Sequence, residues 1–366
     1  MYIKELKLKN FRNYKDLAIY FDRRVNLITG QNAQGKTNLI ESLYMSSMGR
    51  SFRTSHDSEM IMFGEQSAYI KVVCEKEFTD TKVEILLSDI PRKAIKKDGV
   101  SIRKTADLLE NIIIVIFSPD DLKIVKDEPE KRRKFIDREL SQIKPAYFDA
   151  FVRYRRALSE RNSYLKNDDI QESMLEIWDD GLIRYGALLM KYRSEFIEDL
   201  SRIAGNIHSR ITNGKENLGL RYVPNITFAG DINTQEEFIE RELVAARDRD
   251  IRNRTTTVGP QKDDISFLID NINVRNFGSQ GQQRTSALSL KLAELEIIKQ
   301  ETGENAILLL DDVMSELDEE RREYLIRALS ENQIFITTTD IDDSLMRAYP
   351  DAKIIKIEHG TAESDS

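Results

Sequence analysis

Residue types that mark several protein classes are scarce in this sequence. It contains one cysteine, Cys74, so it cannot form an internal disulfide, and we expect it to work in a reducing compartment, the cytoplasm. Its three histidines, His56, His208 and His359, lie far apart and without cysteine neighbours, which argues against a zinc cluster. No stretch approaches the roughly 18 apolar residues of a membrane span, and the initial MYIKELKLKN lacks the apolar core of a signal peptide. We therefore expect no membrane partner.

The charge of the chain is acidic on average but unevenly distributed. Apolar residues make up 40% of the 366, enough for a core in one large domain or two to three small ones. A formal net charge of −8 ordinarily argues against nucleic acid as a partner. Between Lys131 and Arg161, however, ten Lys and Arg residues stand against four acidic ones. This basic segment keeps a nucleic-acid partner open.

The pattern of apolar residues predicts an α/β protein interrupted by helices. Strand signals fill the first third and return after about Arg254, with a continuous apolar run of the buried-strand kind at residues 111–117 and further buried strands expected in AILLLDDV (306–313) and QIFITTTD (333–340). We expect a helix to begin at Pro119, capped by Ser118, and mostly helical structure from there to about Arg254. The chain then divides into a head, residues 1–117 and 255–366, and a helical arm, residues 118–254.

Three shorter segments carry their own predictions. Residues 220–228 (LRYVPNITF) indicate a strand pair near the end of the arm. The basic residues 92–97 (RKAIKK) indicate a turn. The polar tail from Gly360 is predicted to be disordered.

A phosphate-binding loop is the strongest motif in the sequence. Gly30, Gly35, Lys36 and Thr37 have the G-x-x-x-x-G-K-[ST] spacing, after a predicted strand and before a predicted helix. In this motif main-chain N–H groups surround a triphosphate, the lysine reaches its β- and γ-phosphates, and the threonine hydroxyl binds Mg²⁺. The alternative is an ordinary glycine-rich turn. We expect ATP to contact Gly30, Gln31, Asn32, Ala33, Gln34, Gly35, Lys36 and Thr37.

A pair of carboxylates follows a second buried strand. The run ILLLDDVMSELD begins with four apolar residues and presents Asp311 at the strand end, where it would orient Mg²⁺ together with Thr37. Asp312, the next residue, would act on the attacking water as general base, so we assign catalysis to Lys36 and Asp312. Helix capping is the alternative role for such a pair.

The order of the motifs resembles the SMC-like heads of the ABC-type ATPases. The phosphate loop comes first, then the helical insertion, then SQGQQ at a helix start, and then LLLDD and SELD. This resemblance implies an ABC-type P-loop head with an inserted helical arm, and a dimer in which SQGQQ completes the ATP site of the second copy. A flexible loop with an ordinary helix cap is the alternative for SQGQQ. The implied signature residues are Ser279, Gln280, Gly281 and Gln282, and the implied D-loop residues are Ser315, Glu316, Leu317 and Asp318.

Further motifs are similar to those of the RecF family of bacterial DNA replication and repair proteins. They are NFRNY, FSPDDL, RRKFID, VGPQKDD and SQGQQRT, and the resemblance covers residues 3–345. It implies ATP-driven dimerisation, binding of double-stranded DNA and single-strand gap junctions, and support of RecA loading with RecO and RecR. It also implies roles in replication-fork maintenance and SOS induction, and a nucleotide contact for Arg12. Asp312 stands where SMC-like heads usually have Glu, so we expect slow, Mg-dependent hydrolysis stimulated by DNA.

The basic clusters of the arm are candidates for phosphate contacts on duplex DNA. Affinity for a duplex comes mostly from Lys and Arg that neutralise its phosphates, and KRRK at 131–134 and RYRR at 153–156 supply such residues. A solvated helix face is the alternative for each arginine. The candidates are Arg132, Arg133, Arg153, Arg155 and Arg156.

Two other functions fit part of the pattern. The cytoplasmic ATPase subunit of an ABC-type transporter would have a catalytic Glu and a switch His, and both are absent. A metabolic P-loop kinase would bind a small acceptor and would have no use for SQGQQ or SELD.

Overall fold

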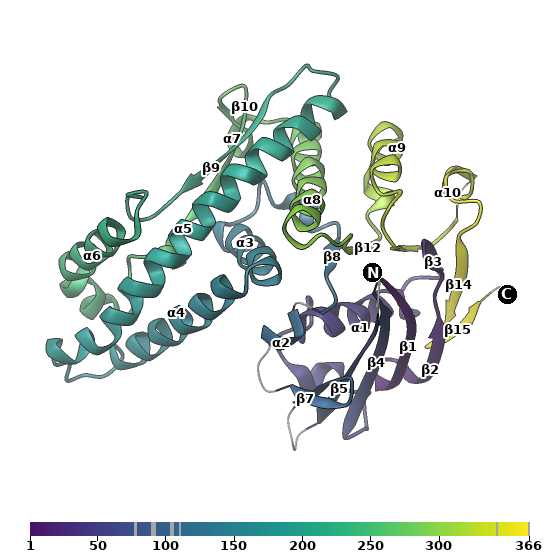
Figure 1. Ribbon diagram of the computed structural model, residues 1–366, viewed down its shortest axis with the longest axis horizontal. Helices are drawn as coiled ribbons and strands as arrows, with labels where there is room; N and C mark the ends of the chain where they lie inside the picture. The colour runs from purple at the N-terminus through teal and green to yellow at the C-terminus, as the bar shows by residue number, and fades with distance from the viewer. Residues whose placement is uncertain (77–78, 89–92, 103–105, 110, 342, 365–366) are drawn as a thin grey trace. The chain divides into compact units, whose positions relative to one another are not determined.

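The computed structural model describes residues 1–76, 79–88, 93–102, 106–109, 111–341 and 343–364. The chain divides into two compact units, one formed by Met1–Asp121 with Ile298–Ser366 and the other by Leu122–Ile297. Figure 1 labels their helices and strands. Within the described residues, none of the helices combines the length and the apolar character that a membrane crossing requires.

The first unit contains an antiparallel sheet with one buried face. Its strand order is β2-β1-β4-β5-β6-β7. Along β1, Leu6 and Leu8 are buried while Lys9 is exposed, the alternation of a sheet that covers a core on one side. The strands are β1 (Tyr2–Phe11), β2 (Tyr14–Tyr20), β4 (Ser67–Glu75), β5 (Asp80–Ser88), β6 (Lys93–Lys97) and β7 (Val100–Ile102).

The second sheet of this unit positions the nucleotide motifs. Its order is β15-β14-β3-β13-β12-β8, with parallel pairing from β14 to β8 and β15 antiparallel at the edge. Every residue of β8 and β12 is buried, as the continuous apolar runs predict. Its strands are β3 (Val25–Thr29), β8 (Ile114–Phe117), β12 (Ile307–Asp311), β13 (Ile334–Thr338), β14 (Lys353–Glu358) and β15 (Thr361–Ser364).

Helix α1 (Lys36–Met48) forms the core between these sheets, because it contacts β4 and β5 of one and β8, β12 and β13 of the other. Its burial is nearly complete, from Leu39 to Met48. The other helical elements of this unit are η1 (Asp57–Met60), α2 (Ala106–Leu109), η4 (Met314–Glu316), α9 (Glu319–Ala328) and α10 (Asp343–Ala348).

The second unit is mainly helical. Helix α5 spans 40 residues, and α4 packs beside it (Figure 1). A small sheet of order β11-β10-β9 packs on α5 through β9. Its elements are α3 (Pro129–Ile143), α4 (Pro145–Tyr164), α5 (Glu172–Ile211), β9 (Leu218–Val223), α6 (Ile232–Asn253), η3 (Pro260–Lys262), β10 (Asp264–Ile269), β11 (Ile272–Asn273), α7 (Val274–Phe277) and α8 (Gln280–Thr302), the last of which ends in the first unit.

The helix expected at Pro119 does not form. Only a short 3₁₀ turn, η2 (Asp121–Lys123), follows β8, and α3 begins at Pro129. The Asp121 carboxylate accepts hydrogen bonds from both the main-chain nitrogen and the hydroxyl of Ser118, each at 2.8 Å. These bonds close a local turn around Pro119 instead of capping a helix.

The expected strand pair at 220–228 is also wrong. Only β9 is a strand, and it pairs with β10, Tyr222 opposite Ile265. Pro224 has no N–H to donate to a ladder, and the next nitrogen, of Asn225, donates to the Asp263 carboxylate at 2.9 Å. The chain therefore leaves the sheet after Val223.

Two segments expected to be irregular are strands. Lys93–Lys97 pairs with β5 as β6, whereas Arg92 lies outside the described residues. The tail residues Thr361–Ser364 pair with β14 as β15. The turn between β14 and β15 has positive φ at His359 (48°) and Gly360 (76°), the geometry of a tight hairpin.

The helical compact unit extends to Ile297, further than the boundary at residue 254 expected for the arm. The reason is that β10 pairs with β9, and that Arg193 in α5 forms an ion pair with Asp263 at 3.0 Å. The assignment of a functional head and arm stays a prediction.

Candidate nucleotide-binding site

The backbone of the phosphate loop requires its glycines. The loop runs from the end of β3 at Thr29 to the start of α1 at Lys36, with φ of 149° at Gly30 and 122° at Gly35. A Cβ on Gly30 would lie 2.4 Å from the carbonyl oxygen of Ile357. A Cβ on Gly35 would lie 2.6 Å from Asn13 Nδ2. Both the conformation and the close approach therefore exclude a side chain.

The turn after β1 braces this loop. Asn13 Nδ2 donates to the carbonyl of Gln34 at 2.7 Å, and the Tyr14 hydroxyl donates to the carbonyl of Gly35 at 3.0 Å. Asn38, one turn into α1, donates to Asn13 Oδ1 at 2.8 Å. Asn13 and Tyr14 belong to the motif NFRNY, but the sequence alone did not predict that they brace the phosphate loop.

The hairpin turn between β14 and β15 holds the other side of the loop. The His359 nitrogen donates to Gln34 Oε1 at 2.6 Å, and the Gly360 nitrogen donates to the Gln34 carbonyl at 3.3 Å. Next to these contacts lies a pocket of about 320 Å³. It is lined by Thr29, Gly30, Gln31, Gln34, Thr339, Lys356, Ile357, Glu358 and His359.

Lys36 is placed for a phosphate. Its ammonium group donates to the carbonyls of Gly30 at 2.5 Å and Gln31 at 3.0 Å, and its side chain is largely buried. Burial lowers the pKa of Lys36, an effect that the carboxylates of Asp312, Asp311 and Asp340 oppose. A partly desolvated cation next to N–H groups favours a polyanion.

The structure brings Thr37 and Asp311 together, although 273 positions lie between them. The Thr37 hydroxyl donates to Asp311 Oδ1 at 3.1 Å, and the Thr337 hydroxyl on β13 donates to the same oxygen at 2.8 Å. Burial raises the pKa of Asp311, and the two threonine hydrogen bonds lower it in part. A nearby cation would stabilise this buried carboxylate in its charged form.

These two residues fit a magnesium ion. Hydroxyl and carboxylate oxygens are the ligands that Mg²⁺ prefers, and in nucleotide sites it takes few of them from the protein and the rest from phosphates and water. No group of three or more His, Cys, Asp or Glu side chains converges anywhere in the described ranges. Thr37 and Asp311 would hold the ion.

Asp312 has an unusual backbone and an exposed side chain. Its φ is 55°, in the left-handed region, and its nitrogen donates to Thr337 Oγ1 at 2.9 Å. Thr337 therefore fixes both members of the carboxylate pair. Sequence reasoning missed this threonine, whose only signal was a hydroxyl in the strand FITTT.

Arg12, expected to contact the nucleotide, is engaged by the protein. Its guanidinium donates to both carboxylate oxygens of Glu41, at 2.9 and 2.7 Å, and to the carbonyl of Glu59 at 2.6 Å. Glu41 is fully buried on α1, and Arg53 lies 3.5 Å from it. A nucleotide contact of Arg12 stays a prediction.

The expected D-loop forms a short 3₁₀ turn followed by a helix. The Ser315 hydroxyl donates to the carbonyl of Asp312 at 2.8 Å, while Leu317 is buried. Asp318 caps α9 by accepting from the Arg321 nitrogen at 3.0 Å. Glu316 is half-buried within the turn.

In the helical unit, the signature residues form a reciprocal cap at the start of α8. The Gln282 nitrogen donates to the Ser279 hydroxyl at 3.2 Å, and the Ser279 nitrogen donates to Gln282 Oε1 at 2.9 Å. Gln280 is the first residue of the helix and Gly281 the second. The expected helix start at SQGQQ is confirmed, and its action on a second copy stays a prediction.

Arg132 does not suit the DNA contact expected of it. It is 1% exposed, and its guanidinium forms two hydrogen bonds with the Asp264 carboxylate, at 2.6 and 2.9 Å. It also donates to the carbonyl of Ile124 at 3.0 Å. Because its charge is neutralised inside the unit, this arginine is unsuited to neutralise a DNA phosphate, and loss of Asp264 would leave a buried charge uncompensated.

The other candidate arginines differ in exposure. Arg133 is half-buried and donates to the carbonyl of Asp263 at 2.8 Å. Arg153 and Arg156 are exposed on α4 and pair with Asp149 and Glu160 one turn away. Arg155 is exposed and lies over the ring of Phe151, 5.7 Å from its centre.

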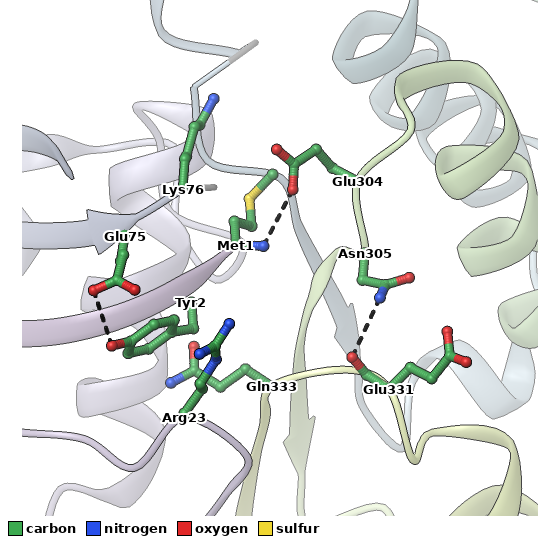
Figure 2. Close-up of a pocket in the computed structure, with 9 residues that line it drawn as sticks. All are labelled: Met1, Tyr2, Arg23, Glu75, Lys76, Glu304, Asn305, Glu331 and Gln333. Carbon is green, nitrogen blue, oxygen red and sulfur yellow. Dashed lines mark hydrogen bonds and ion pairs between the residues drawn. The ribbon is translucent and has the colours of Figure 1, made fainter. Parts of the chain in front are cut away.

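A second pocket of the first unit, of about 350 Å³, lies at the amino ends of β12 and β13 (Figure 2). The phosphate loop follows the carboxyl end of the parallel strand β3, so this pocket occupies the opposite edge of the sheet. The Met1 nitrogen and Glu304 lie 3.1 Å apart, and the Tyr2 hydroxyl donates to Glu75 at 3.0 Å. None of the residues that line this second pocket belongs to the nucleotide motifs.

Comparisons with known proteins agree on one family. The model described as the RecF/RecN/SMC N terminal domain matches residues 2–363. A protein of Clostridium tetani named DNA replication and repair protein RecF is 43% identical over 362 residues, which cover 98% of this chain and 99% of that protein. One of the same name from Alkaliphilus oremlandii is 45% identical over 341 residues, 93% of each chain.

Solved structures give the same result. The structure described as the recombination mediator protein RecF-ATP in the RecFOR pathway superposes with a TM-score of 0.91 and 38% identity, covering 100% of this chain and 98% of that one. The Smc head domain from Pyrococcus furiosus matches with a TM-score of 0.56 at 17% identity, which shows the shared fold alone. The chain therefore belongs to the RecF family and has the α/β fold of the ABC-type, SMC-like ATPase heads.

Proposed function

We propose that this protein is an ATP-dependent DNA-binding switch in recombinational DNA repair. One observation carries the proposal: Lys36, Thr37 and Asp311 converge at the ends of β3 and β12 beside a loop braced from two sides. The relatives that match the whole chain are named for DNA replication and repair, and a matching structure is described with ATP. They give no support to the alternative of a transporter subunit.

The loop residues would bind ATP through their main-chain nitrogens and the Lys36 ammonium. Thr37 and Asp311 would hold Mg²⁺, which when bound neutralises charge on the phosphate oxygens. Asp312 would orient the attacking water and accept its proton. Because aspartate is one methylene shorter than glutamate, we expect slow hydrolysis, and we expect DNA to stimulate it.

Dimerisation would complete the site. Ser279 and Gly281, at the start of α8, would present N–H groups and a hydroxyl to the γ-phosphate held by the second copy, with Gln280 and Gln282 alongside. The D-loop from Ser315 to Asp318 would cross between the copies. ATP would then act as the contact that joins two chains.

DNA would bind along exposed arginines of the helical unit. Arg153, Arg155 and Arg156 lie on one segment of α4 and keep their side chains in solvent. We expect binding to double-stranded DNA and to single-strand junctions, and cooperation with RecO and RecR in RecA loading, since matching structures are described within the RecFOR pathway. Fork maintenance and SOS induction follow from the same assignment.

The test is sedimentation and duplex binding of the wild type, Lys36→Ala and Ser279→Arg, each with and without ATP. The wild type should dimerise and bind DNA more tightly with ATP. Lys36→Ala should lose nucleotide binding, whereas Ser279→Arg should keep nucleotide binding and lose dimerisation. Lys15→Ala, an exposed lysine of β2, is the matched control. A wild type that stays monomeric with ATP would overturn the switch.

A further inference from the structure

A buried histidine lies at the end of the long helix α5. His208 is 0% exposed and belongs to the last turn of α5. Its Nδ1 lies 3.2 Å from the hydroxyl of Ser289 on α8, and its Nε2 lies 3.0 Å from Glu216 Oε2. A carboxylate only accepts hydrogen bonds, so Nε2 carries a proton and donates to Glu216. Both ring nitrogens are therefore engaged inside the unit.

Glu216 connects this histidine to the signature residues. Its other oxygen, Oε1, accepts from Gln282 Nε2 at 2.9 Å. The same Gln282 side chain accepts from the Ser279 nitrogen through Oε1, at 2.9 Å. The amide of Gln282 is thus held at both ends, by Glu216 on one side and by the signature backbone on the other. Its orientation follows from these two partners.

The end of α5 is fixed to the small sheet that leads to this contact. The Leu220 nitrogen on β9 donates to the Ser201 hydroxyl of α5 at 2.8 Å. A Cβ on Gly205 would lie 2.8 Å from the carbonyl oxygen of Leu218, so helix and strand approach as closely as glycine allows. A displacement of the end of α5 would therefore carry His208 and Glu216 with it.

We propose that His208 and Glu216 are positioning residues of the signature motif. They hold Gln282, and through it Ser279, in the orientation that meets the nucleotide of a second copy. They also connect the 40-residue helix α5 to that motif. The inference rests on the proposed ATP-dependent dimer.

The first experiment measures dimerisation separately from nucleotide binding. For Glu216→Ala we expect the ATP-dependent dimer to weaken about tenfold, from the loss of a hydrogen bond to a charged group. Binding of a fluorescent ATP analogue by the monomer should stay within twofold of the wild type, because the phosphate loop takes no part in the hydrogen-bond relay from His208 through Glu216 and Gln282 to Ser279. Glu216→Gln keeps an oxygen for Gln282 and should recover most of the dimerisation. Glu237→Ala, an exposed glutamate on α6, is the matched control and should equal the wild type.

The second experiment tests this hydrogen-bond relay in the monomer, where dimerisation plays no part. Hydrogen exchange of the amides in residues 279–286, without ATP, should be faster in Glu216→Ala and in His208→Asn, and unchanged in Glu237→Ala. If the wild type fails to dimerise with ATP, the proposed function fails while this exchange still reports the relay. Wild-type exchange in Glu216→Ala would overturn the inference. An equal rise in exchange throughout the helical unit would also overturn it, because it would show a purely structural role.

Discussion

The two compact units organise their polar groups by different means. In the unit with the phosphate loop, main-chain groups shape that loop: Gly30 and Gly35 adopt φ values that favour glycine, and carbonyls hold Lys36. In the helical unit, buried ion pairs between side chains hold the interior. Such main-chain geometry can be predicted from the sequence, because only glycine fits these positions. An arginine in the sequence, by contrast, does not indicate whether its side chain is buried or exposed.

Two buried arginines show the second arrangement. Arg161 is 0% exposed and donates to Asp179 and Asp250, each at 2.7 Å. Arg193 donates to Asp137 at 2.7 Å and to Asp263 at 3.0 Å. Burial lowers the pKa of Arg193, but the surrounding acidic groups raise it by more than burial lowers it. The net effect is a raised pKa, so the guanidinium stays charged. Removal of one partner of such a pair leaves an uncompensated buried charge.

The largest effect should come from Arg161→Met. Asp250 is 0% exposed and would lose its ion partner, so we expect a loss of about 3–5 kcal/mol in the free energy of unfolding. Urea unfolding followed by circular dichroism measures it. Arg156→Met, five positions earlier and 79% exposed, breaks the pair with Glu160 and should change the free energy of unfolding far less, because solvent screens this pair. Equal losses in the two variants would show that burial of an ion pair makes no difference to stability within the helical unit.

Gly30→Ala should act on function more than on stability. The new Cβ would approach the Ile357 carbonyl oxygen to 2.4 Å at a φ of 149°, so the loop must shift. Because a misplacement of about 1 Å can slow catalysis about a hundredfold, we expect the rate of ATP hydrolysis to fall by about that factor, and ATP affinity to fall with it. Gly64→Ala is the control: its φ is 87° with open space around it, and ATP titration should match the wild type. Undiminished affinity in Gly30→Ala would show that the glycine is dispensable.

The sequence predicted those parts that a single element encodes. The phosphate loop and the strand before Asp311 could be recognised because spacing and burial are local properties. The hydrogen bonds of Asn13 to the phosphate loop and of Thr337 to Asp311 could not be predicted, since each joins segments that only the sheets bring together. Arg132 was misassigned for a related reason, because its partner Asp264 lies 132 positions away.

Replacement of Arg153, Arg155 and Arg156 by Gln tests exposed charge in the helical unit. These side chains carry only partners that solvent weakens, so they remain able to neutralise phosphates. We expect duplex affinity to fall about tenfold at low salt, and the slope of log affinity against log salt to become shallower by about two to three. Arg327→Gln, 79% exposed on α9, is the single-charge control. An unchanged salt slope would place the DNA elsewhere.

The smallest effect should come from Asp231→Asn, at the start of α6. The Asp231 carboxylate accepts from the Thr234 nitrogen at 2.9 Å, and this hydrogen bond lowers the pKa of Asp231. A lowered pKa in the folded state means that the charged carboxylate adds stability above its unfolded pKa, and that this stability is lost as the pH falls through the folded value. Asparagine caps almost as well but carries no charge. The thermal midpoint of the wild type should therefore exceed that of Asp231→Asn slightly at pH 6, and the two should converge as the pH approaches 3. A difference that grows on acidification would contradict the assignment of Asp231 as a charged cap.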